Sequence, residues 1–154
     1  GDIVPVTLIK TESPPAGLQV IKPATARAMR RMLELAVGDE GTAPAARIAG
    51  WRVAGKTGTA RKLKHGRYVN AYVASFAGFA PASDPRLVVA VMIDEPDASR
   101  GRYYGGDVAA PVFAQIVAGA LRTLQVFPDG PIDRTQGRPP EPPRLPLERL
   151  AKAT

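Results

Sequence analysis

The chain contains 154 residues, of which 45% are hydrophobic and 23% are charged, a composition typical of one globular domain. It contains no cysteine, which excludes a disulfide scaffold, a thiol nucleophile and a zinc site built on sulfur. The excess of 21 Lys and Arg over 14 Asp and Glu gives a net charge of +7. This charge favours anionic surroundings such as nucleic acid, acidic lipid or a cell-wall polymer.

The sequence predicts a folded body that comprises residues 1–127. Its first predicted element is a helix that begins at Pro23. Apolar residues recur there at spacings of three and four, with arginines on the opposite side. Pro23 suits the first helical position, and Gly38 suits the residue just past the end.

Three strand-like runs follow at residues 51–60, 71–80 and 87–94. The first two are joined by about ten residues that include Gly66, and the last two by a short turn rich in proline. Neither connection is long enough for a crossover helix, so we expect an antiparallel meander.

A second helix is predicted from Asp107, as its cap, to about Leu124. Its uncharged run of 14 residues (108–121) is shorter than the roughly 20 residues that cross a bilayer, so we expect it to be buried against the sheet. The predicted fold class is therefore α+β, a three-stranded antiparallel sheet with an N-terminal helix and a covering C-terminal helix. Residues 128–154 hold seven of the sixteen prolines and are expected to form a flexible, extended tail.

Residues 50–57 match the phosphate-loop pattern G-x-x-x-x-G-K-[ST]. That motif needs a strand before the loop and a helix after it, so that the helix N-terminus faces the phosphate. Here the intervening residues are strand-like, and Thr57 is followed by Gly58, Thr59 and a basic turn. The sequence therefore disfavours nucleotide binding.

The same segment, Lys56-Thr57-Gly58-Thr59, carries the K-T-G signature of penicillin-binding proteins and serine β-lactamases. Further blocks extend the match over residues 18–125, namely 40–46, 53–60, 76–82, 104–106 and 110–113. Together they resemble the class B penicillin-binding transpeptidases, and within that class the cell-division enzymes of Gram-negative bacteria. The resemblance implies part of a penicillin-binding or serine β-lactamase-like transpeptidase fold.

The chemistry of these residues suits the carboxylate that ends a D-alanyl-D-alanine peptide. The ammonium of Lys56 and the hydroxyls of Thr57 and Thr59 offer charge-assisted hydrogen bonds to that anion. Gly58 leaves room for the substrate backbone. Strand alternation puts Lys56 and Gly58 on one face and the two threonines on the other, so one groove can hold them all only at a sheet edge.

The resemblance also implies roles for other residues. The backbone N–H of Thr59 would be one of two oxyanion-hole donors. Tyr72, Tyr103 and Tyr104 would wall a side-chain pocket, and Arg61 would reach anionic substituents. No metal or organic cofactor is implied.

Two motifs of that family are absent from the sequence. None of the four serines has Lys three residues later or Asn two residues later, so the Ser-x-x-Lys nucleophile and the Ser-x-Asn triplet are missing. We therefore expect the C-terminal part of a transpeptidase domain, inactive alone, whose partner is the missing N-terminal half. The resemblance places the complete enzyme in the inner membrane with its catalytic domain in the periplasm. It would act there on peptidoglycan stem peptides, bind β-lactam antibiotics and meet division-complex proteins.

The alternative is a noncatalytic basic module that binds nucleic acid or another polyanion. Arg61, Lys62, Lys64 and Arg67 account for four of the seven net charges and cluster near one turn. No regular aromatic interleaving accompanies them, so the sequence favours a solvated hairpin tip without nucleic acid binding. Salt-sensitive binding of DNA or RNA would discriminate between the two functions.

Overall fold

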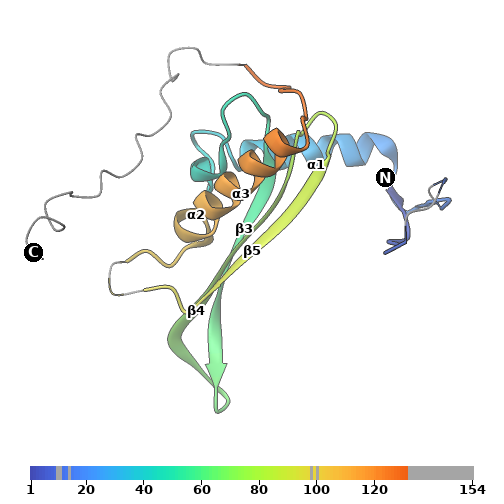
Figure 1. Cartoon of the computed structure of the whole chain (residues 1–154). Coiled ribbons are helices and arrows are strands. Elements are labelled where there is room, and N and C mark those ends of the chain that lie inside the picture. Colours follow the sequence, from blue (N-terminus) through green and yellow to red (C-terminus); the bar gives the residue numbers. More distant parts are fainter. Residues whose placement is uncertain (10–11, 14, 98, 100, 132–154) are drawn as a thin grey trace, which may run out of the picture.

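The computed structural model describes residues 1–9, 12–13, 15–97, 99 and 101–131. Its centre is a three-stranded antiparallel sheet in the order β3 (Ala54–Lys64), β4 (Arg67–Ala80), β5 (Leu87–Asp94) (Figure 1). Helix α1 is Pro23–Leu35 and helix α3 is Ala110–Thr123. Four short elements complete the described part: β1 (Asp2–Ile3), β2 (Leu18–Gln19), η1 (Pro44–Ala46) and α2 (Gly105–Val108). The predicted α+β class and the antiparallel meander are confirmed.

The core lies between α3 and one face of the sheet. Thr57 on β3 is paired with Phe76 on β4, which is paired with Val91 on β5, so these three side chains share that face. The buried ring of Phe76 meets Phe113 of α3 edge to face, with centroids 4.8 Å apart. Of the described elements, α1 lies against the opposite face at one end of the sheet, where Leu33 shares a small cavity with residues of β3, β4 and β5.

The β3–β4 hairpin is longer than predicted. β3 begins at Ala54 rather than at residue 51, continues to Lys64, and is joined to β4 by His65 and Gly66 alone. Both turn residues have positive φ, 51° and 74°, the geometry of a two-residue hairpin turn whose twist matches that of the strands. The expected connection of about ten residues was wrong. Both faces of the hairpin near its tip are in solvent, so these strand residues are mostly polar and lack the apolar pattern by which strands are recognised.

The predicted second helix is divided in two. α2 ends at Val108, and α3 restarts at Ala110 with Pro111 in its first turn, where a missing N–H leaves no hydrogen bond unmade. Asp107 lies within α2 and does not cap either helix. One face of α3 is buried, but Ile116 on the other is half exposed. In the described part of the chain, no helix is long and apolar enough to span a membrane.

Asp129 fastens the segment after α3 to the body. Its carboxylate accepts hydrogen bonds from the backbone N–H of Arg52 (2.7 Å) and from the N–H (3.1 Å) and hydroxyl (2.6 Å) of Ser83. Burial raises the pKa of Asp129, but these bonds and the Arg52 charge outweigh it and leave the pKa below its ordinary value. Contacts with the body thus continue past Phe127. The rest of the expected proline-rich tail, from residue 132 on, lies outside the described residues.

Two glycines allow a stability test of the packing of α2. A Cβ added at Gly105 would overlap the carbonyl oxygen of Ser75 and lie 2.7 Å from that of Gly58, whereas one added at Gly119 in α3 would meet nothing within 4 Å. We expect Gly105→Ala to lower the free energy of unfolding by about 1–3 kcal/mol. Gly119→Ala should raise it by about 0.5–1 kcal/mol through helix propensity. Urea unfolding of both variants measures this, and equal stabilities would contradict the close approach of α2 to the sheet.

Candidate active site

The K-T-G segment lies on β3, which is an edge strand among the described residues. The side chain of Lys56 starts on the face opposite α3 and turns round this edge. Its Nζ donates to the carbonyl oxygen of Thr57 at 2.9 Å and lies 3.5 Å from Thr57 Oγ1. Its ammonium forms no ion pair with a carboxylate in the part of the chain that the structure describes. The edge therefore presents a cation that is bonded only to neutral oxygens.

Thr57 and Thr59 point to the α3 side of the sheet and line a cavity of about 320 Å³. Thr57 Oγ1 lies 3.1 Å from Thr42 Oγ1, and Thr59 Oγ1 accepts a hydrogen bond from the N–H of Gly105 at 3.1 Å. The other residues that line the cavity are Thr42, Tyr104, Gly105, Gly106 and Asp107. The Lys56 ammonium thus lies next to the Thr57 hydroxyl, and the Thr57 and Thr59 hydroxyls line one cavity at this rim of the sheet.

Sequence reasoning missed Thr42. It lies in one of the blocks that carry the family resemblance, but a hydroxyl 15 residues before Thr57 gives no sign of contact with it. Folding of the loop between α1 and β3 brings the two together. The close approach of Gly106 to the Thr42 carbonyl oxygen, where a Cβ would overlap, fixes this loop against α2.

The backbone N–H of Thr59 faces the open edge. Residues in an antiparallel pair alternate between those bonded to the partner strand and those whose N–H and C=O both point away from it. The Tyr72 carbonyl accepts from Glu95 N–H, so Tyr72, Ala74 and Phe76 point their polar groups toward the β5 side. Their partners on β3 include Thr57 and Thr59, whose backbone N–H and C=O groups accordingly point away from β4, toward the open edge.

Gly58 has a structural reason in addition to the predicted one. It is paired with Ser75, and a Cβ at Gly58 would lie 2.5 Å from Ser75 Oγ. The absent side chain therefore leaves the Ser75 hydroxyl in the position that it adopts, whereas a Cβ at Gly58 would require that hydroxyl to rotate away.

The three predicted tyrosines gather next to this rim. Tyr103 stacks on Tyr72 with ring centroids 4.2 Å apart and lies 4.5 Å from the ring of Tyr104. The Tyr103 hydroxyl donates to the Tyr104 hydroxyl at 3.2 Å. That hydrogen bond, together with the charge of a neighbouring phenolate, raises the pKa of Tyr103 to about 12. Tyr72 is anchored to Asn70 by a hydrogen bond of 3.1 Å.

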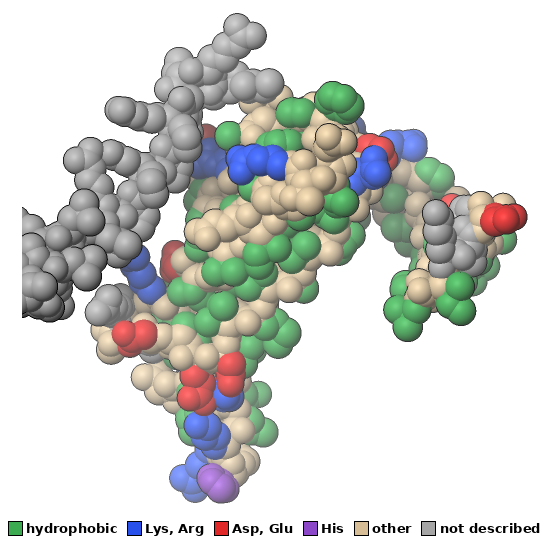
Figure 2. Space-filling view, in the orientation of Figure 1, with side chains coloured by type: hydrophobic (Ala, Val, Ile, Leu, Met, Phe, Trp, Pro, Cys, Tyr) green, Lys and Arg blue, Asp and Glu red, His purple; other side chains and the backbone are tan. Residues whose placement is uncertain are grey.

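Arg61 lies on β3, two residues after Thr59 and opposite Tyr72 of β4, and is exposed. Beyond it the hairpin projects from the body, with basic and acidic side chains side by side toward its tip (Figure 2). Lys62 pairs with Asp94 (2.8 Å) and Glu95 (2.9 Å), and Lys64 also pairs with Glu95. The bonds from Lys62 and then Lys64 lower the pKa of Glu95. Two of the four clustered basic residues are thus already neutralised by acids at the end of β5.

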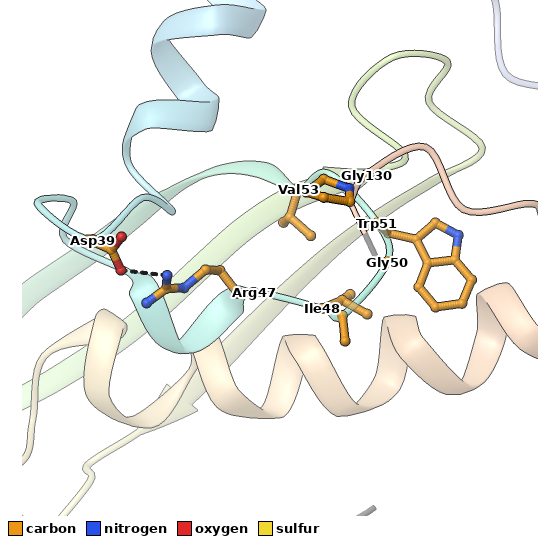
Figure 3. A pocket seen from close by; sticks show the side chains of 9 residues that line it. Asp39, Arg47, Ile48, Gly50, Trp51, Val53 and Gly130 are labelled. Carbon is orange, nitrogen blue, oxygen red and sulfur yellow. Dashed lines mark hydrogen bonds and ion pairs between the residues drawn. The ribbon is translucent and has the colours of Figure 1, made fainter. Parts of the chain in front are cut away.

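A larger cavity, of about 600 Å³, lies away from the K-T-G rim. Figure 3 shows Ile48, Trp51 and Val53 along it, and Arg47 bonded to Asp39. The one arginine that lines this cavity, Arg47, is paired with Asp39, so this cavity offers no unpaired guanidinium to an anionic ligand. The described residues also hold no cluster of three or more His, Asp and Glu that could bind a metal ion.

Comparison with known proteins agrees with this geometry. The sequence model of the penicillin binding protein transpeptidase domain matches residues 1–118. The chain belongs to this family. Among solved structures, the apo transpeptidase domain of penicillin-binding protein 3 from Burkholderia pseudomallei is 48% identical, with a TM-score of 0.76 over 85% of this chain and 40% of that one.

Curated relatives carry similar names. The probable peptidoglycan D,D-transpeptidase PenA of Neisseria flavescens is 46% identical over 88% of this chain and 34% of its own length. The peptidoglycan D,D-transpeptidase FtsI of Escherichia coli K12 is 44% identical over 81% of this chain and 21% of its own length. The chain thus spans about a third or less of these penicillin-binding proteins.

The tyrosine cluster gives a pH test. Ionised Tyr103 could no longer donate its hydrogen bond to Tyr104 and would place its charge beside the Tyr104 phenolate, so the pKa of Tyr103 is raised. We expect Tyr104→Phe to bring it from about 12 down toward the ordinary value of about 10. Phenolate absorbance in an alkaline titration follows the change. Tyr68→Phe on the exposed hairpin is the control, and the prediction is wrong if both variants shift the curve equally.

Proposed function

We propose that this chain forms the K-T-G-bearing part of a peptidoglycan D,D-transpeptidase of the cell-division type. The observation that carries the proposal is the open edge of β3, where Lys56 Nζ approaches the Thr57 hydroxyl and Thr59 lines the same cavity. A cation and hydroxyls at the border of a groove suit a peptide that ends in a carboxylate. The free edge would let that peptide lie alongside β3 as an added strand.

In the proposed reaction, a serine outside this chain attacks the carbonyl carbon of the penultimate D-alanine. The peptide bond breaks, the terminal D-alanine leaves with a proton on its amine, and a serine ester remains. An amine of a neighbouring stem peptide then attacks the ester and releases the serine. The outward N–H of Thr59 would stabilise the oxyanion in both steps, a role worth about 3–4 kcal/mol in comparable acyl-transfer enzymes. A β-lactam would form the same ester and remain attached.

The tyrosines and Arg61 would complete the substrate groove. Tyr72 and Tyr103 form a stacked wall beside the K-T-G rim, which suits the apolar part of a substrate or antibiotic side chain. Arg61 is exposed on the same strand and forms no ion pair with an acid among the described residues, so it is available to an anionic substituent. These residues would set selectivity, while Lys56, Thr57 and Thr59 would recognise what all substrates share.

The rest of the domain would complete the sheet. The outer edge of β5 has no strand partner among the described residues, and Val88 and Met92 on the face opposite α3 are 79% and 72% exposed. Residues 1–127 would therefore act as one part of a domain whose other part supplies the Ser-x-x-Lys and Ser-x-Asn motifs. We place the catalytic domain in the periplasm of an inner-membrane protein and expect contacts with other division proteins.

Acylation by a fluorescent penicillin tests the proposal. We expect no covalent adduct with the 154-residue chain alone, and a stable adduct when it is joined to the part that carries the two missing motifs. In the joined protein, Lys56→Ala should slow acylation by about tenfold or more through loss of charge-assisted bonds.

Lys62→Ala is the matched control for Lys56→Ala, since it removes a lysine from the same strand that pairs with Asp94 and not with the rim. Its acylation rate should stay within about twofold of the unchanged protein. An adduct with the chain alone, or equal effects of the two lysine variants, would overturn the proposal.

The polyanion-binding alternative is tested separately. Because Asp94 and Glu95 neutralise Lys62 and Lys64, we expect double-stranded DNA to bind the chain only at low salt and to be released near 0.15 M salt. Fluorescence anisotropy of a labelled duplex measures this. Binding that survives at that salt concentration and is lost on Arg61→Ala or Arg67→Ala would favour the alternative.

A further inference from the structure

The third hydroxyl at the rim, that of Thr42, is held in place by the fold. The next residue, Ala43, is fully buried, and its N–H donates to the carbonyl oxygen of Ala36 at 2.9 Å. On the other side, Gly106 packs directly on the Thr42 carbonyl oxygen. The backbone of Thr42 is thus fixed between the end of α1 and the start of α2, and its hydroxyl has a defined place 3.1 Å from that of Thr57.

The hydrogen-bonding capacity of the groups involved limits how protons are arranged there. A threonine hydroxyl has one proton to donate and two lone pairs, a lysine ammonium only donates, and a carboxylate only accepts. If Thr57 donates its proton to a ligand carboxylate, it cannot also donate to Thr42. The Thr42–Thr57 hydrogen bond then requires Thr42 to be the donor.

The neighbouring hydroxyl follows the same rule. Thr59 Oγ1 accepts a hydrogen bond from the N–H of Gly105, which leaves the Thr59 proton free to point into the cavity. Each of the two K-T-G hydroxyls that line the cavity therefore has a group behind it that can donate a hydrogen bond. Behind Thr59 that donor is a backbone group, whereas behind Thr57 it would be the side chain of Thr42, which mutation can remove.

We propose that Thr42 is a positioning residue, which donates a hydrogen bond to Thr57 and so directs the Thr57 proton toward the carboxylate of the substrate or β-lactam. This inference rests on the proposed function. A chain of hydroxyls that all point one way also strengthens each bond in it, and the negative charge at its end favours that direction. Thr42 need not touch the ligand, because it acts through Thr57.

The test uses two pairs of variants that differ only in the hydroxyl, in the protein that joins this chain to the missing motifs. Thr42→Val keeps the shape of the unchanged residue and removes the hydroxyl, and Thr42→Ala does the same relative to Thr42→Ser. The second-order rate constant of acylation is measured by mass spectrometry with benzylpenicillin and with its methyl ester, which lacks the carboxylate.

With benzylpenicillin we expect a loss of about fivefold to tenfold in Thr42→Val, and a similar ratio between the Ser and Ala variants. Thr42→Ser should stay within about twofold of the unchanged protein. With the methyl ester, each pair should react at nearly equal rates. If Thr42→Val fails to fold, as its unfolding transition will show, the Ser–Ala pair decides.

Other outcomes separate the two proposals. Equal rates with benzylpenicillin across both pairs would overturn the role of Thr42 and leave the proposed function standing. An equal loss with the acid and the ester would assign Thr42 a merely structural role, which also overturns the inference. If the unchanged joined protein is not acylated at all, the proposed function fails, and the role of Thr42 fails with it.

Discussion

The open edge of β3 is the constraint on which the rest of the site depends. Side chains on a strand alternate between two faces, so Lys56 and Thr57 would be separated by the sheet if another strand lay alongside them. At an edge, a long side chain can turn round the backbone, and the bond from Lys56 Nζ to the Thr57 carbonyl oxygen shows that it does. The same edge frees the outward N–H of Thr59. Because β3 has no strand neighbour on this side among the described residues, the cation, the hydroxyls and the backbone donor are all accessible at one rim.

Close packing of α2 against the sheet brings the second group of site residues to this edge. Gly105 lies against the backbones of β3 and β4, and Gly106 lies against the loop of Thr42. Because neither glycine has a side chain, α2 can approach closely enough for the Gly105 N–H to reach Thr59 Oγ1. This packing also places the two preceding residues beside β4, where Tyr103 stacks on Tyr72 and contacts Tyr104. Local backbone contacts therefore join parts of the site that are far apart in the sequence.

Much of the fold could be predicted from short-range features, while contacts between distant segments could not. The two links between strands are too short for crossover helices, which gave the meander, and the K-T-G letters located the rim. The full hairpin was missed because residues 61–70 lack apolar alternation. Ion pairs between Lys62 and acids 32 and 33 residues away stabilise it, and such distant pairs cannot be read from the sequence. The break before α3 could have been inferred from Pro111. The contact of Thr42 with Thr57 could not have been inferred, since only the folded loop brings the two residues together.

Asp129 binds the backbone N–H of Arg52, two residues before β3 begins, and its Ser83 partner sits in the turn between the other two strands. The segment after α3 therefore acts as a strut at the end of the sheet where the β4–β5 turn lies, and it holds the residues just before the K-T-G strand. Lengthening or shortening the chain between Thr123 and Asp129 would pull on that strut and shift where β3 starts. Variation in a region remote from the ligand could in this way retune the groove without altering any residue that lines it.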